Sequence, residues 1–449
     1  MMRLVAKKVA GDKMEIKQLT VAIAGTGARG ADTYAACAEL YPEKMKIVAA
    51  ADLRADRLRN AAQKYNIPEE NCFSTVEQML EQDQLADVML ICTQDRQHVK
   101  HAIPAMRKGY HILIEKPISP DLEECREIIR VAEETNRTVM VCHVLRFTPF
   151  YNKLKQLLDD GTIGEIVSIQ HIENVGYWHQ AHSYVRGNWR RSDETSPMIL
   201  AKCCHDLDLL LWLTGKHCLR VNSFGGTYLF RKEKAPDGAA LRCLDGCACQ
   251  AECPYDCERQ YITGKTGFDS GRTNWPVDVV AMNPTREKLY EALRTGPYGR
   301  CVYYCDNDAV DHQIVNMELE DGVTCQMTMC AFNEGGRRTK IMGTLGEIEC
   351  DLEKNTIYVH RFCKEEYTFD VTTLLDKEGM RGHAGGDHRM VEEFLDIVSG
   401  RIAPTVRTTT LADSVESHFV ALAAEISRKE KGRTVSISEV SKQTRILKD

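Results

Sequence analysis

The N-terminal third of the chain alternates short apolar, often β-branched runs with longer stretches in which apolar residues recur at helical spacing. The short runs predict strands at 19–24, 46–51, 88–92, 111–115 and 138–142. The stretches between them carry apolar residues at i, i+3 and i+4, which predicts helices at 55–64, 99–108 and 122–135. This alternation predicts an α/β domain whose parallel sheet is covered on both faces.

Beyond residue 150 the pattern changes to longer runs, several of which alternate apolar and polar residues. They predict strands at 166–174, 219–229, 312–318 and 324–329. Helical spacing predicts helices at 198–213, 390–398 and 412–429. We therefore expect an α+β domain with a large, mostly antiparallel, open sheet that leaves one face to solvent.

Regular periodicity disappears between about 231 and 300, where Cys, Gly, Pro and polar residues are frequent. Because so long an irregular stretch is uncommon unless it is functional or cross-linked, we interpret it as an insertion. The predicted organisation is a leader at 1–18, a first domain at 19–145 and a second domain at 146–449 that contains the insertion.

Composition narrows the classes of partner. The 449 residues are 43% hydrophobic and 27% charged with a net charge of −7, which is typical of a soluble globular protein without a basic surface for nucleic acid. The sequence contains no run of 18 apolar residues, and 1–18 lacks the apolar core of a signal peptide. We expect a cytoplasmic protein that acts on a small molecule and uses neither a membrane nor nucleic acid.

A glycine-rich loop follows the first predicted strand and precedes a helical stretch. It reads Gly25-Thr26-Gly27-Ala28-Arg29-Gly30, and Asp52 stands at the end of the next strand, about 20 residues further on. In this context the glycines predict a Rossmann domain whose loop approaches a pyrophosphate, and the acid predicts a contact with the ribose hydroxyls of NAD. Arg54 and Arg57 leave NADP as an alternative, because a guanidinium pairs with its 2′-phosphate.

Three further motifs carry a resemblance to a known family. The chain reads Thr93-Gln94-Asp95-Arg96-Gln97-His98, then Gly109-Tyr110-His111, then Glu115-Lys116-Pro117. These resemble the T-P-N-x-x-H, G-K-H and E-K-P motifs of the Gfo/Idh/MocA family of sugar and polyol dehydrogenases, and the resemblance covers nearly the whole chain outside the insertion. It implies that Thr93, His98, Glu115 and Lys116 border the cofactor.

Lys116 and His205 are the predicted catalytic residues. Lys116 ends a strand of an open parallel sheet, where the ligand crevice forms, and its charge lowers the pKa of a neighbouring proton donor. Family members carry G-G-x-x-x-D-x-x-x-H-x-x-D in the second domain, and His205 and Asp208 match that pattern while Ala201 replaces its aspartate. His205 is therefore the predicted base. Lys202 either substitutes for the missing carboxylate or faces solvent.

Segment 177–191 mixes His, Tyr, Trp, Asn and Arg without helical or strand spacing, so we interpret it as a substrate loop, with a polar surface loop as the alternative. Tyr184 is an alternative acid or base. The predicted substrate ligands are Arg146, His179, His182, Arg186, Asn188, Trp189, Arg190, Lys202 and Asp208. His383 and Asp387 are secondary candidates by resemblance to a G-H-G-G-x-D motif, although Asp387 could instead be the N-cap of the next helix.

Five of the 19 cysteines fall within 15 residues of the insertion, at 243, 247, 249, 253 and 257. Clustered thiols predict a structural zinc ion, with an iron–sulfur cluster or plain thiols as alternatives. Relatives with this insertion share R-C-x-D-G-C and C-P-Y, which implies Cys243, Cys247 and Cys253 as ligands. Cys301, where regular pattern resumes, is the predicted fourth ligand, and Cys249 and Cys257 are its rivals.

The resemblance implies hydride transfer between NAD and a secondary alcohol of a sugar, cyclitol or glycoside. One alternative is a hydrolase or lyase in which NAD oxidises the sugar transiently so that a leaving group is eliminated. Another is a sugar sensor without catalysis, for which Ala201 is the only support. By analogy with relatives that assemble through the open sheet face, we expect a homodimer or homotetramer.

Overall fold

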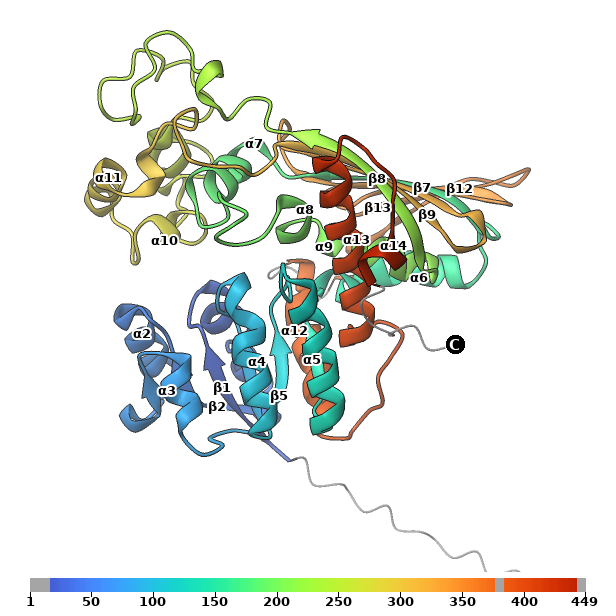
Figure 1. The fold of residues 1–449 in the computed structure, drawn as a ribbon, viewed down its shortest axis with the longest axis horizontal. Coiled ribbons are helices and arrows are strands. Elements are labelled where there is room, and N and C mark those ends of the chain that lie inside the picture. Colours follow the sequence, from blue (N-terminus) through green and yellow to red (C-terminus); the bar gives the residue numbers. More distant parts are fainter. Residues whose placement is uncertain (1–16, 376–382, 442–449) are drawn as a thin grey trace, which may run out of the picture.

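The computed structural model describes residues 17–375 and 383–441, so the predicted leader lies almost wholly outside the described part. Two sheets, each with its own helices, lie one above the other (Figure 1). The glycine loop and the predicted catalytic residues lie between them. None of the described helices is both long and apolar enough to cross a membrane.

The first sheet has six strands in the order β3-β2-β1-β4-β5-β6, and every neighbouring pair is parallel. The strands are β1 (Leu19–Ala24), β2 (Met45–Ala51), β3 (Cys72–Phe73), β4 (Val88–Ile91), β5 (His111–Ile114) and β6 (Val139–Val141). Successive strands are added toward one edge of the sheet from β1 to β3 and toward the other edge from β4 to β6. The order therefore reverses between β1 and β4, and a Rossmann domain opens its ligand crevice at such a point. The predicted parallel sheet is confirmed.

Helices on both faces cover this sheet, as predicted. They are α1 (Cys37–Leu40), α2 (Ala55–Tyr65), α3 (Val76–Glu81), α4 (His98–Arg107) and α5 (Leu122–Thr135). The C-terminal helix α12 (Gly386–Val398) joins them, because Met390 and Phe394 pack in the same apolar cluster as Val21 and Ile47. Helix α12 thus packs on the first domain, although it lies within the segment assigned to the second, and the chain then returns to the second sheet, where β15 pairs with β8.

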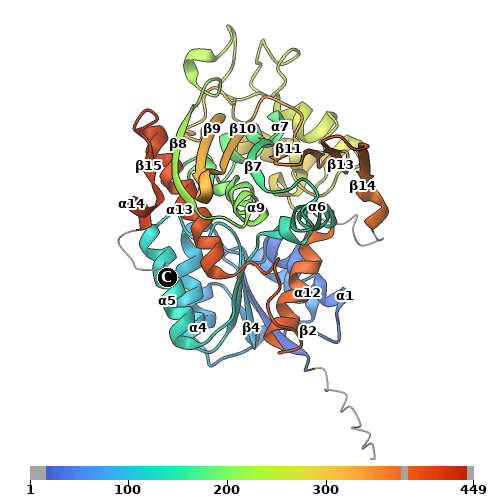
Figure 2. The same cartoon turned by 90° about the vertical axis from the view of Figure 1, so that its right-hand side faces the viewer.

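The second sheet has nine strands in the order β14-β13-β12-β11-β7-β10-β9-β8-β15. They are β7 (Ile166–Asn174), β8 (Cys218–Gly226), β9 (His312–Leu319), β10 (Thr324–Cys330), β11 (Gly336–Gly343), β12 (Gly346–Asp351), β13 (Thr356–Arg361), β14 (Tyr367–Asp370) and β15 (Val435–Ser436). Only the β7–β10 pair is parallel, so the prediction of a mostly antiparallel sheet is confirmed. The helices α6 (Pro149–Asp159), α9 (Cys204–Thr214), α13 (Leu411–Lys429) and α14 (Ile437–Ser441) lie on the side toward the first domain (Figure 2).

Two predictions in this domain are wrong. The helix expected at 198–213 breaks at Lys202 and Cys203 into α8 (Met198–Ala201) and α9. The loop expected at 177–191 contains a short helix α7 (Tyr177–His179) that continues as the π-helical turn η5 (Gln180–Arg186), in which all seven residues are buried. Wide turns place side chains at a spacing that the 3.6-residue period does not detect, and they are frequent at functional sites.

The insertion is more regular than its sequence suggested. It contains α10 (Val277–Val280) and α11 (Arg286–Thr295), whose N-terminus is capped by the Thr285 side chain. Tyr261, Leu289 and Leu293 are fully buried in a small apolar cluster of the insertion's own. Figure 1 shows this unit beside the second sheet, above the helix α2 of the first domain.

Candidate functional site

The glycine loop has the shape that a bound dinucleotide requires. A Cβ on Gly25 (φ +94°) would lie 2.6 Å from the carbonyl oxygen of Cys92, and one on Gly30 would lie 2.0 Å from that of Gly25. A Cβ on Gly27 would meet only Arg57 Nη1, at 3.4 Å. The backbone is therefore packed tightly behind the loop and open in front of it at Gly27, where a pyrophosphate can approach.

Asp52 lies at the mouth of this loop, directly after β2. Its Oδ2 accepts hydrogen bonds from Thr26 N at 2.7 Å and Thr26 Oγ1 at 3.0 Å, and its Oδ1 accepts one from Arg54 N at 2.8 Å. The Arg54 guanidinium pairs with Asp56 at 2.6 Å. Asp52 is thus held fixed beside the glycine loop, and the Arg57 guanidinium rather than that of Arg54 lies next to Gly27.

Arg29 points away from the front of the loop and binds two carboxylates. Its Nε lies 2.7 Å from Glu115 Oε1, and its Nη2 lies 2.7 Å from Asp387 Oδ1. Glu115 Oε2 also accepts a hydrogen bond from Lys116 N at 2.9 Å. Burial raises the pKa of Glu115, but the charges of Arg29 and Lys116 outweigh it and keep this pKa below its usual value. The network fixes the end of β5 against the glycine loop.

Asp387 has both oxygens engaged, by Arg29 and by His383 Nδ1 at 3.0 Å. The residue at the N-cap of α12 is Gly385, so the N-cap role considered for Asp387 is wrong. Its carboxylate joins the first turn of α12 to the glycine loop. His383, in contrast, is partly exposed and faces the site.

His98 joins the loops that follow β4 and β5. Its Nδ1 lies 2.7 Å from the Pro117 carbonyl oxygen, and its Nε2 lies 2.9 Å from that of Thr93. The Thr93 hydroxyl lies 3.1 Å from His101 Nδ1. His98 therefore positions the two loops that carry Thr93 and Lys116 at the cofactor edge.

Lys116 and His205 lie near enough for the charge of Lys116 to act on the imidazole. Lys116 Nζ donates a hydrogen bond to the backbone carbonyl of Ala201 at 2.9 Å. His205 lies in the first turn of α9, is buried, and has no partner for Nδ1 among the described residues. Burial, followed by the charge of Lys116, holds the pKa of His205 well below its usual range. The imidazole is therefore neutral at pH 7 and can accept a proton.

A second buried histidine, which the sequence analysis did not consider, lies beside His205. The ring centroids of His143 and His205 are 5.5 Å apart, and those of His383 and His205 are 6.5 Å apart. Neither ring nitrogen of His143 has a hydrogen-bond partner in the described part of the chain. His143 closely follows β6, so its place at the carboxyl edge of a parallel sheet was the signal available in the sequence.

Lys202 is part of a network of ion pairs. Its ammonium is therefore engaged by another side chain, and it is largely shielded from solvent. Its Nζ lies 3.2 Å from Glu173 Oε1, while Arg337 Nε lies 2.8 Å from Glu173 Oε2 and 2.7 Å from Asp206 Oδ1. Ala201 itself is buried in the apolar core. The sequence analysis missed Glu173 and Arg337, because β11 was not predicted and because in β7 the charged Glu173 is buried while the apolar Ile172 is exposed.

His179, the last residue of α7, and Tyr184 on the wide turn η5 lie close together, with ring centroids 5.9 Å apart. Burial raises the pKa of Tyr184 well above its usual value, so the phenol keeps its proton at neutral pH. Burial, followed by the charge of Lys202, lowers the pKa of His179 well below its usual value. Trp189 closes this side, since its Nε1 donates to Asp95 Oδ1 at 3.1 Å.

The structure places other predicted substrate ligands in contacts within the protein. Arg146 and Asp208 form a buried two-point ion pair with distances of 2.7 and 2.6 Å. His182 Nδ1 lies 3.0 Å from the Tyr261 hydroxyl in the insertion. Arg190 pairs with Asp306 at 3.2 Å. Their polar groups are engaged, and they do not enter the proposed site.

Asn188 is exposed on the surface. Arg186 lies in the interior of the insertion, where its Nη2 donates to the Cys243 sulfur at 3.6 Å. Neither residue is next to Lys116 in the contacts described.

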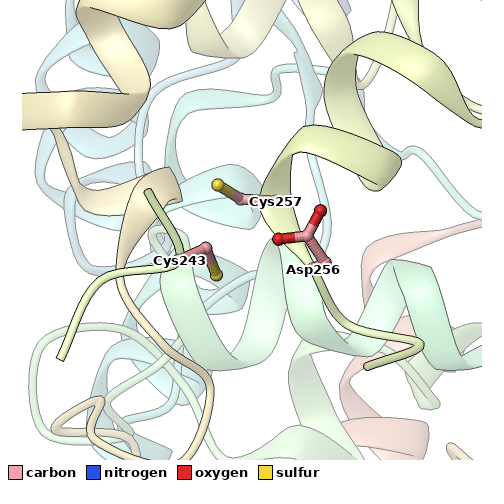
Figure 3. A group of neighbouring side chains, drawn as sticks. All are labelled: Cys243, Asp256 and Cys257. Carbon is pink, nitrogen blue, oxygen red and sulfur yellow. The ribbon is translucent and has the colours of Figure 1, made fainter. Parts of the chain in front are cut away.

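The insertion gathers its thiols around one cavity. It is lined by Cys243, Cys247, Cys249, Cys253 and Cys301, together with Arg186 and Asp256. Ligand atoms of Cys243, Asp256 and Cys257 lie within 4.8 Å of one another (Figure 3). The hydrogen bond from Cys257 lowers the pKa of the Cys243 thiol to about 6. Soft sulfur donors in such number suit zinc, and the sequence analysis missed Asp256.

Comparison with known proteins agrees with this geometry. Residues 19–143 match the Gfo/Idh/MocA family described as an oxidoreductase family with an NAD-binding Rossmann fold, and residues 155–437 match its C-terminal alpha/beta domain. A solved inositol dehydrogenase homolog complexed with NAD+ from Azotobacter vinelandii has 15% identity and a TM-score of 0.68, covering 95% of this chain and 100% of that one. At this identity the likeness concerns the fold.

Two curated relatives differ in the chemistry that their names state. Inositol 2-dehydrogenase of Corynebacterium glutamicum (strain R) is 28% identical over 46% of this chain and 57% of its own length. The 2,7-anhydro-N-acetylneuraminate hydratase of Escherichia coli (strain K12) is 23% identical over 81% of this chain and 84% of its own length. Since the two family matches span most of the sequence, the protein belongs to the Gfo/Idh/MocA family of NAD-binding oxidoreductases.

Proposed function

We propose that the protein transfers a hydride between NAD and a secondary alcohol of a sugar, cyclitol or glycoside. The observation that carries the proposal is the pair of Lys116 and His205 at the carboxyl edge of the parallel sheet. His205 is a buried, neutral imidazole with an unpartnered nitrogen, and the charge of Lys116 acts on it. A base and a cation so placed suit the removal of a hydroxyl proton.

The residues have distinct tasks. The glycine loop and Asp52 would hold NAD, which supplies the hydride acceptor when bound. His205 accepts the proton of the carbinol hydroxyl. The ammonium of Lys116 stabilises the negative charge that develops on the carbinol oxygen, because an oriented cation in a site shielded from water costs little reorganisation. Tyr184, which keeps its proton, is suited to donate a hydrogen bond to the substrate.

A hydrolase or lyase is the second candidate, and the Escherichia coli hydratase supports it because that relative spans most of both chains. In this reaction oxidation of the sugar is transient. The C–H next to the transient carbonyl becomes acidic and gives its proton to His205, and the leaving group departs with a proton that Tyr184 can donate. In the hydrolase, water then adds to the double bond that the elimination leaves. In both reactions the hydride finally returns to the carbonyl carbon. No net NADH forms.

Absorbance at 340 nm across a panel of sugars, cyclitols, uronates and glycosides tests the proposal. Net NADH formation with a free sugar supports the dehydrogenase. Release of an aglycone or of water at catalytic NAD, without net NADH, supports the second candidate. Binding of NAD and sugar without either reaction indicates the sensor, and contradicts both enzymatic proposals.

Three finer predictions also remain proposals. The open face of the second sheet exposes Phe224 (56%), Ile314 (39%) and Ile172 (38%), which lie in one row across β8, β9 and β7, and this supports assembly of a homodimer or homotetramer through this face. Light scattering after gel filtration measures that state. The five thiols around one cavity support a structural zinc ion in the insertion. The cytoplasmic location stays a prediction from the sequence.

A further inference from the structure

Two buried imidazoles, those of His143 and His205, lie next to each other. His143 is 1% exposed and His205 is 7% exposed. Their ring centroids are 5.5 Å apart and their planes are inclined by 78°, so the edge of one ring faces the other ring. Both nitrogens of His143 and Nδ1 of His205 are buried and have no hydrogen-bond partner among the described residues. Because buried polar atoms are almost always hydrogen-bonded, these three nitrogens call for a partner.

The other groups that act on His205 are engaged elsewhere. Lys116 donates to a backbone carbonyl at 2.9 Å. Arg337 binds two buried carboxylates. The ring of His383, with its centroid 6.5 Å from that of His205, binds a carboxylate through Nδ1. His143 is therefore the neighbour that can offer His205 Nδ1 an acceptor.

On its other side His143 faces a buried ion pair. Its Nε2 lies 4.0 Å from Asp208 Oδ1, and Arg146 binds both oxygens of Asp208 at 2.7 and 2.6 Å. A carboxylate oxygen has two lone pairs, so Asp208 Oδ1 can accept one more hydrogen bond. The charge of Glu115 also acts on His143, but this carboxylate is held by an arginine and a tyrosine hydroxyl. The ring of His418, with its centroid 6.2 Å away, uses both nitrogens in hydrogen bonds with the backbone.

Two separate elements bring this group of residues together. His205 and Asp208 are three residues apart on α9, so their side chains leave the helix on the same side. His143 closely follows β6, at the carboxyl edge of the parallel sheet. Its ring therefore lies between two side chains one helical turn apart. Arg146, Asp208, His143 and His205 form a row of adjacent groups that leads from the ion pair to the proposed base.

We propose that His143 is a positioning residue for His205: it accepts the Nδ1–H of His205 and donates its own Nε2–H to Asp208. This arrangement leaves His205 Nε2 as the nitrogen that receives the substrate proton, because the hydrogen bond at one ring nitrogen decides which tautomer a histidine adopts. The χ2 torsion of histidine is broad, so small rotations close both contacts, and catalytic hydrogen bonds often tighten only in the substrate complex. The inference rests on the proposed function.

The proton is accounted for at each atom. The O–H bond of the carbinol breaks and an N–H bond forms at His205 Nε2, while the hydride leaves the carbinol carbon for the cofactor. His205 becomes an imidazolium whose Nδ1–H stays bonded to His143, which offsets the cost of a buried charge. No proton passes beyond His205, so Asp208 keeps its ion pair. In the lyase reaction the same nitrogen receives the C–H proton, and the role of His143 is unchanged.

The tautomer of His205 can be measured without an activity assay. In the full-length protein with nitrogen-15-labelled histidine and bound NADH, ring-nitrogen NMR shifts distinguish protonated from unprotonated nitrogens, and His205→Asn identifies the signals. We expect His205 of the wild type to be protonated at Nδ1 alone, and His205 of His143→Phe to be a mixture of both tautomers. His143→Gln, whose amide can accept from His205 and donate to Asp208, should keep the wild-type pattern.

Two results would overturn the proposal. One is a wild-type His205 that is protonated at Nε2. The other is an unchanged His205 pattern in His143→Phe, at a circular dichroism spectrum equal to that of wild type. If His143→Phe does not fold, the tautomer of the wild-type protein still decides between the proposal and its rejection.

Steady-state kinetics separate positioning from packing. His143→Phe keeps a ring of similar size, and we expect its kcat to fall by about 10²-fold while KM changes by less than about 3-fold. His143→Gln should recover most of this loss. His418→Gln, which alters the other imidazole beside His143, is the matched control: it should lower the melting temperature and leave kcat within about 3-fold of wild type.

An unchanged kcat in His143→Phe would overturn the positioning role. An equal loss in His143→Phe and His418→Gln would also overturn it, because any disturbed packing would then suffice. If the wild-type protein transfers no hydride at all, the proposed function fails, while the tautomer of His205 still tests the contact with His143.

Discussion

Lys116 Nζ lies 2.9 Å from the backbone carbonyl oxygen of Ala201, the position at which family members carry an aspartate. The ammonium therefore contacts the main chain where the family pattern leads one to expect a carboxylate. No acidic side chain at position 201 offsets its charge toward His205. This contact explains why the missing aspartate leaves the pair of Lys116 and His205 intact, and it sets the first two predictions.

Replacing Lys116 by Met removes the ammonium while keeping most of the side-chain volume. We expect turnover to fall by about 10²–10⁴-fold, because the charge on the carbinol oxygen loses its partner. Steady-state kinetics with the substrate found in the panel measure this change. The affinity for NAD, followed by fluorescence titration, should change much less. A variant with unchanged turnover would remove Lys116 from the catalytic machinery.

The pH dependence of turnover follows from the lowered pKa of His205. A base must be neutral to accept a proton, and a histidine with an ordinary pKa of about 6.5 would lose half of its activity at that pH. We expect turnover to be the same on both sides of pH 6.5 and to decline only at a pH well below that value. His205→Asn should abolish this decline together with most of the activity.

Residual activity of Lys116→Met offers the matching control. Without the positive charge of Lys116 the pKa of His205 rises, so the acid limb of the profile should move to higher pH. An unshifted limb would mean that another group controls the profile.

The fold was largely predictable from the sequence, because most of its strands and helices are marked by patterns of apolar residues within a single segment. The apolar strands of the first sheet and helices such as α5, with its Asp121 cap, satisfy simple periodic patterns. Strands β11 to β14 were missed, since polar and charged residues such as Arg337 and Arg338 interrupt their alternation. In β11 the partner of Arg337 is the buried Asp206, which no pattern within one strand reveals.

The candidate site was predictable to the extent that motifs mark it. Lys116 and Asp52 follow strands, and strand ends are visible in a sequence. The roles of the arginines in the second domain could not be told apart from the sequence. Arg146 and Arg186 looked alike as anion ligands, but the first pairs with Asp208 and the second enters the insertion. Only tertiary contacts separate a substrate ligand from an ion pair or from a residue buried in the insertion.

Acid should destabilise the protein through buried histidines before its carboxylates protonate. Burial lowers the pKa of His182 and of His418 to about 3 each. Because the unfolded chain takes up these protons below about pH 6.5 and the folded chain does not, each residue lowers the free energy of unfolding by about 1.4 kcal/mol per pH unit below that value.

Urea unfolding between pH 7.5 and 5 measures this slope. His182→Phe keeps a ring against Tyr298 and should reduce the slope by about 1.4 kcal/mol per pH unit. The variant should also be less stable at pH 7.5, because the Tyr261 hydroxyl loses its partner. A slope that the substitution leaves unchanged would show that His182 protonates in the folded state.

Asp52→Ala tests the cofactor preference. The substitution removes the acceptor for the ribose hydroxyls and frees Thr26 N, which Asp52 holds at 2.7 Å, so we expect NAD to bind about 10-fold more weakly, or about 1.4 kcal/mol. It also removes the charge that repels a 2′-phosphate, and Arg57 stands beside Gly27 to receive that group. NADP should therefore bind more tightly than it does to wild type. Calorimetric titration with both cofactors measures the two changes. Asp52→Asn, which keeps an oxygen for Thr26 N but removes the negative charge, is the matched control and should weaken NAD binding less than Asp52→Ala does. Equal losses for NAD and NADP in Asp52→Ala would instead indicate that Asp52 shapes the loop without selecting the cofactor.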